Sequence, residues 1–103
     1  MKGTISRASV NDSEGRSIFP NMSPKKNFIH YVNDKFNKNL KPGRENKLNL
    51  IVKVGNENHK FLGHFNKSRG DFYISLREWN RFSGIHIDVG NTIGCEIIAV
   101  EEI

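Results

Sequence analysis

The chain has 103 residues, of which 36% are hydrophobic, and this length allows one small domain with a single core. Sixteen Lys and Arg against eleven Asp and Glu give a net charge of +5, which favours an anionic partner such as nucleic acid, a lipid surface or an acidic protein. No apolar run reaches the roughly 18 residues of a membrane span, and none follows Met1, so we expect an intracellular protein without membrane anchor or signal peptide.

The first quarter of the chain combines one expected strand with a long polar loop. Thr4 to Val10 is predicted as a strand. Residues 11–27 are rich in Asn, Asp, Ser, Gly and Pro, the composition of a loop. This loop carries three cations, Arg16, Lys25 and Lys26. We therefore divide the single domain into a strand plus basic loop, 1–27, and a barrel body, 28–103.

The body is expected to begin with a short strand and a helix. Phe28 to Tyr31 is aromatic and β-branched, which favours a strand. Apolar side chains then recur every fourth residue from Val32 to Leu40, the spacing of one helix face. Pro42 and Gly43 are expected to end this helix. Its outward positions carry the lysines Lys35, Lys38 and Lys41.

A hairpin and a cationic turn follow. Apolar and polar residues alternate cleanly from Leu48 to Val54, which predicts a half-buried strand. Residues 55–58 have turn composition, and Lys60 to Phe65 is predicted as the returning strand. The next turn, 66–71, is polar and opens with Asn66, Lys67, Ser68 and Arg69.

The last third contains two further strands around a second helix. Phe72 to Leu76 alternates as a strand, and Trp79 and Phe82 lie three apart, as on one face of a short helix. A long final strand is expected from Thr92 to Ile103, with Ile93, Cys95, Ile97 and Ala99 on one face. Cys95, the only cysteine, is interpreted as small buried filler. Many strands with short turns predict a mostly β barrel or sandwich whose two short helices plug the ends.

The order of these elements resembles the B3-type DNA-binding domain. The resemblance rests on the helix at 35–40, the hairpin at 48–65, the strand leading into Trp79-Asn80-Arg81-Phe82, and the turn and strand at 89–93. Domains of this family occur in plant transcription factors and as recognition domains of some restriction endonucleases. The resemblance implies a seven-stranded open pseudobarrel that binds double-stranded DNA as a recognition module, without catalysis, cofactor or metal.

The family grips the major groove with two projections, and their positions here are the two cationic loops. By position, the first corresponds to residues 11–27 and the second to 66–71. Arg can pair with guanine and Asn with adenine, whereas Lys and Ser suit phosphate contacts. The DNA-binding residues implied in this chain are Arg16, Lys25, Lys26, Asn66, Lys67, Ser68 and Arg69.

The sequence is also compatible with other functions. Asp34, Glu45 and Lys47 have the spacing of a metal-dependent nuclease, but the expected turn around Glu45 does not suit that chemistry. His59 and His64 are five apart on one strand, which puts them on opposite faces and disfavours joint metal binding. A small barrel that binds RNA or an acidic protein is the main alternative to DNA binding.

Overall fold

The computed structural model describes residues 1–7, 15–21, 28–41, 43, 46–66, 71–81 and 85–103. These residues form six strands and two helices. In chain order the elements are β1 (Lys2–Ser6), β2 (Arg16–Pro20), α1 (Phe28–Phe36), β3 (Lys47–Val54), β4 (Glu57–Asn66), β5 (Asp71–Ile74), α2 (Leu76–Asn80) and β6 (Thr92–Glu102).

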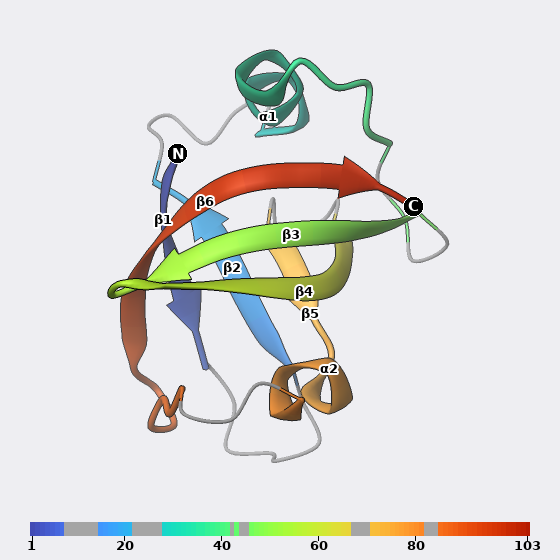
Figure 1. The fold of residues 1–103 in the computed structure, drawn as a ribbon. Helices are drawn as coiled ribbons and strands as arrows, with labels where there is room; N and C mark the ends of the chain where they lie inside the picture. Colours follow the sequence, from blue (N-terminus) through green and yellow to red (C-terminus); the bar gives the residue numbers. More distant parts are fainter. Residues whose placement is uncertain (8–14, 22–27, 42, 44–45, 67–70, 82–84) are drawn as a thin grey trace.

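The strands close into a barrel in the order β1-β2-β5-β4-β3-β6, and every neighbouring pair is antiparallel. Helix α1 lies at one end of the barrel and α2 at the other (Figure 1). The predicted mostly β barrel with two end helices is therefore confirmed. The described residues form six strands in a closed barrel, so the seven strands and the open arrangement that the resemblance implies are not confirmed. Residues Ile85 to Val89 form no strand, and Gly90 and Asn91 bond to the main chain of Arg7.

Alternating side chains from the strands fill the barrel, as the sequence pattern requires. The predicted hairpin is confirmed: Leu50 lies opposite Phe61, and both side chains are completely buried. Phe65 and Phe72 stack across β4 and β5 with ring centroids 4.6 Å apart. The buried apolar residues are Ile5, Ile18, Val32, Leu40, Leu48, Leu50, Val52, Phe61, Phe65, Phe72, Ile74, Trp79, Ile87, Ile97 and Val100.

Strand β6 contains an irregularity that changes its inward face. The register with β3 shifts between Ile51 and Val52, which lie opposite Ala99 and Ile97 respectively. Ile98 is the extra residue and is 43% exposed. As in other β-bulges, the extra residue resets the alternation of the strand. The predicted inward position of Ala99 is therefore wrong, and Val100 is buried in its place.

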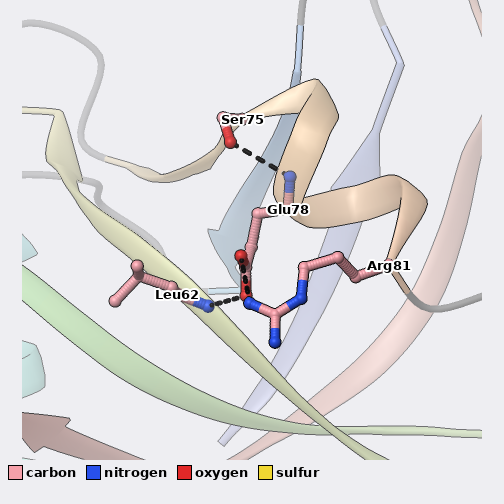
Figure 2. A network of polar contacts seen from close by, with 4 residues as sticks. All are labelled: Leu62, Ser75, Glu78 and Arg81. Atoms are coloured by element: carbon pink, nitrogen blue, oxygen red, sulfur yellow. Dashed lines mark hydrogen bonds and ion pairs between the residues drawn. The ribbon is translucent and has the colours of Figure 1, made fainter.

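Helix α2 compensates for the shortness of β5. Strand β5 pairs with β4 only at His64 to Asn66, so Leu62 has no partner on that side. The Glu78 carboxylate accepts a 2.9 Å hydrogen bond from the Leu62 amide and a 3.0 Å bond from Arg81 (Figure 2). The Ser75 hydroxyl caps the helix by accepting from the Glu78 amide. A side chain of α2 thus satisfies a main-chain donor that a longer β5 would have paired.

Helix α1 begins earlier than predicted and also ends earlier. The expected strand from Phe28 to Tyr31 is wrong, because these residues form the first turn of the helix. Val32 is completely buried and Ile29 packs beside it, at the i, i+3 spacing of one helix face. The helix ends before Asn37, whose φ of 53° is left-handed. The Lys38 amide then bonds back to the Asn33 carbonyl at 2.9 Å, a typical C-terminal helix cap.

Strand β2 lies inside the segment that composition predicts as one loop. Ile18 is completely buried and pairs with β1 at Ile5 and with β5 at Phe72. The polar residues on both sides obscure this short apolar stretch in the sequence. The interpretation of 11–27 as one loop is therefore wrong, because β2 crosses the whole barrel between two separate connections.

Candidate nucleic-acid interface

Each of the two predicted cationic loops contributes one segment that begins and ends at the same end of the barrel. Asn21 and Phe28 flank residues 22–27, which include Lys25 and Lys26, and Asn66 and Asp71 flank residues 67–70, which include Lys67, Ser68 and Arg69. These five side chains lie outside the described residues. Because β2 is antiparallel to β5, and β5 to β4, the end of β2, the start of β5 and the end of β4 all lie at the α1 end (Figure 1).

Asn66 and Arg16 occupy strand ends rather than loops. Asn66 is the last residue of β4, opposite Asp71, at the α1 end. Arg16 is the first residue of β2, near α2, and is only 6% exposed. Its guanidinium lies 5.6 Å from the centre of the Trp79 ring and donates a 3.2 Å bond to the Gly15 carbonyl. Arg16 is therefore separated from the other candidates by the length of the barrel, and its burial supports a packing role.

Four exposed lysines at the α1 end were not included in the predicted site. Between the end of α1 and the start of β3 they follow one another at intervals of three, three and six residues. Arg44, which lies outside the described residues, stands in the middle of the six-residue interval. In the part of the chain that the structure describes, no ion pair engages their ammonium groups. This three-residue spacing was the sequence signal that could have identified them. The four are Lys35, Lys38, Lys41 and Lys47, called here the lysine row.

Asn33 fixes the backbone that carries the middle of this row. Its side-chain oxygen accepts a 2.8 Å bond from the Leu40 amide, and its side-chain nitrogen donates a 3.2 Å bond to the Leu40 carbonyl. The Leu40 side chain is itself buried in the core. Lys38 and Lys41 therefore project from a segment held both by a polar clamp and by a buried anchor.

A cleft of about 460 Å³ opens beside this segment. Its lining comes from the segment with Asn39 and Lys41, from the start of β3 and from the end of β6, where Leu48 lies opposite Glu102. The side chains that line the cleft include two lysines and one glutamate. The described lining residues are Asn39, Lys41, Asn46, Lys47, Leu48, Glu102 and Ile103.

The residues weighed as enzymatic groups lie on separate elements or outside the described residues. Asp34 is exposed on α1 and Lys47 begins β3, while Glu45 lies outside the described residues. Within the described ranges, no group of three His, Cys, Asp or Glu side chains could hold a metal ion. His59 and His64 lie on opposite faces of β4, as predicted, since His59 stacks on inward-facing Phe61 and His64 contacts outward-facing Tyr73.

Cys95 has the surroundings of a packed rather than a reactive thiol. It packs against the core of the barrel on the inward side of β6, opposite Gly3. Burial raises the pKa of the Cys95 thiol from 9.0 to about 11, which the nearby amino terminus only partly offsets. A thiol that stays protonated at neutral pH is a poor nucleophile, so the interpretation as filler agrees with its position.

Comparison with family models, with curated proteins and with solved structures finds no match to this chain. The resemblance to the B3-type domain therefore stays a prediction based on the order of elements and the positions of the loops. Among the described residues, neither helix has the length and apolar character needed to cross a membrane.

Proposed function

We propose that this protein binds double-stranded DNA through the α1 end of its barrel, with sequence preference supplied by residues 66–69. The observation that carries the proposal is the collection of cations at one end. The lysine row is exposed there, and the flanking residues of both segments that hold Lys25, Lys26, Lys67 and Arg69 lie at the same end.

The chemistry of these groups divides the proposed work. Ammonium groups of the lysine row, Lys25, Lys26 and Lys67 contact phosphates, which gives affinity and positions the protein without reading sequence. Arg69 and Asn66 carry the planar donors and acceptors that can distinguish guanine and adenine in the major groove. Ser68 adds a phosphate contact. Arg16, which is buried near α2, is left out of the proposed interface.

The finer assignment is a B3-type recognition module of a restriction enzyme or of a regulator, without catalysis of its own. Two strands, a helix, three strands, a helix and a closing strand follow one another in this chain, which supports the resemblance. A seventh strand and an opening of the barrel would complete the family pattern.

The test is selection from a randomised duplex pool, followed by titration of the selected duplex at several salt concentrations. We expect binding that weakens steeply with salt. Arg69→Ala should lower affinity and broaden the selected sequence, whereas Lys67→Ala should lower affinity about equally for all sequences. Arg77→Ala, an exposed arginine on α2, is the matched control and should change neither property. Failure of the wild type to bind duplex DNA at low salt would refute the proposal.

RNA and acidic proteins are the alternative partners, and the same experiment separates them. Preference for single strands in a parallel selection from RNA would replace DNA with RNA. Capture of one acidic protein that persists after nuclease treatment, together with no duplex binding, would favour a protein partner. Mg²⁺-dependent plasmid cleavage that is lost in Glu45→Ala would revive the nuclease hypothesis.

A further inference from the structure

We infer that the cleft between Lys41 and Lys47 holds a single phosphodiester of the bound nucleic-acid backbone. This inference rests on the proposed function and adds one defined contact to it. The cleft lies at the α1 end, beside the lysine row, and two lysines of that row line it, one from the segment after α1 and one from the start of β3. Two donors that line the same cleft can contact the two non-bridging oxygens of one phosphate, whereas lysines on a convex surface would contact separate phosphates.

The two backbone segments that carry the cleft lysines are held in place before any ligand binds. Lys41 follows Leu40, whose main chain is clamped by Asn33 and whose side chain is buried. Lys47 begins β3, and the adjacent Leu48 is paired to β4 at Gly63 and to β6 at Glu102. A rigid backbone at both lysines reduces the entropy cost of ordering on binding. That cost would otherwise offset much of the binding free energy gained from two long, flexible side chains.

The charge of the cleft side chains matches a diester better than a monoester. Lys41 and Lys47 supply two positive charges to the lining, and Glu102 places a carboxylate beside them. A phosphodiester carries one negative charge, whereas a phosphomonoester carries about −1.5 to −2 at neutral pH. Glu102 therefore penalises the extra charge of a terminal phosphate, and the amide of Asn39 offers an additional donor to either ligand.

The experiment compares two double variants of equal net charge in salt titrations of the selected duplex. Lys41→Gln with Lys47→Gln removes both ammonium groups from the cleft. Lys53→Gln with Lys60→Gln removes two exposed lysines near the tip of the β3–β4 hairpin and is the matched control. One lost phosphate contact should make the slope of log K against log salt shallower by about 0.9, and two separate contacts by about 1.8.

We expect a slope change of about 0.9 for the cleft variant and none for the control. A change of about 1.8 would overturn the shared phosphate, and equal changes in both variants would overturn the cleft as the site. Vesicles of phosphatidylserine serve as the second arm, because lipid headgroups also carry a phosphodiester. An equal loss of vesicle and duplex binding in the cleft variant would overturn the assignment to nucleic acid. Wild-type protein that binds no duplex refutes the proposed function itself, before the variants are compared.

Discussion

Removal of the Glu78 carboxylate tests how the barrel tolerates its short β5. One oxygen of this carboxylate accepts the Leu62 amide at 2.9 Å, and the residue is only 8% exposed. Loss of a hydrogen bond to a charged group costs about 1.5–3 kcal/mol when the donor is left without a partner. The Arg81 side chain is 66% exposed, so its ion pair with Glu78 adds at most about 1 kcal/mol.

We therefore expect Glu78→Ala to lower the free energy of unfolding by about 2–3 kcal/mol, which corresponds to about 10 °C in Tm for a chain of this size. Glu78→Gln keeps one acceptor oxygen for Leu62 but sets an amide against Arg81, and should cost about 1 kcal/mol. Arg81→Ala removes only the exposed ion pair and should cost less than about 1 kcal/mol. The predicted loss of unfolding free energy is therefore largest for Glu78→Ala, smaller for Glu78→Gln and smallest for Arg81→Ala.

The assay is urea denaturation followed by Trp79 fluorescence and by far-ultraviolet circular dichroism. Trp79 is the only tryptophan, is 4% exposed and stacks on Phe61, so its emission reports on the α2 end. Coincident transitions by the two probes would justify a two-state treatment. If Glu78→Ala is no less stable than Arg81→Ala, the hydrogen bond to Leu62 contributes nothing to stability, and Glu78 does not compensate for the shortness of β5.

Three further predictions concern stability and reactivity. Gly63→Ala should lower the free energy of unfolding by about 1–3 kcal/mol in the same denaturation assay, because a Cβ at this position would lie 2.6 Å from the Tyr73 carbonyl oxygen. Asn33→Ala should cost about 1–2 kcal/mol and also weaken duplex binding, since it releases the backbone beside Lys41; unchanged binding would separate the clamp from the interface. Cys95, with its pKa raised to about 11, should react with iodoacetamide at pH 8 about 100-fold more slowly in the folded protein than in urea. Because folding raises this pKa, the associated stability is complete below pH 9 and is lost as pH rises toward 11.

The strands with strict alternation were predictable from sequence, whereas the elements shaped by tertiary contacts were not. Leu48, Leu50, Val52 and Val54 recur at every second position, and both the strand and its hairpin partner were found. Phe28 to Tyr31 has strand propensity but forms a helix, because Ile29 and Val32 together cover one end of the core. In β2, Ile18 is completely buried, but the polar residues on both sides of this short strand hide it in the sequence.

The candidate site was predictable in its loops but incomplete in its extent. Composition alone directed attention to the segments with Lys25, Lys26, Lys67 and Arg69. The lysine row was missed because its members fall on a helix end, an irregular segment and a strand start, so that their three-residue spacing crosses the boundaries of the expected elements. Arg16 was expected in a loop but begins β2, and a cation in polar sequence gives no sign that its side chain lies over Trp79.

The closed sheet limits how this molecule can acquire partners. Each of the six described strands is paired on both sides over at least part of its length, so none of them is free along a whole edge to take up a foreign peptide as a seventh strand. The proposed recognition is assigned to the segments that leave the barrel ends, whose sequence can vary without altering the strand register. Exchange of residues 22–27 and 67–70 is thus a natural route to proteins that keep this framework and select different targets.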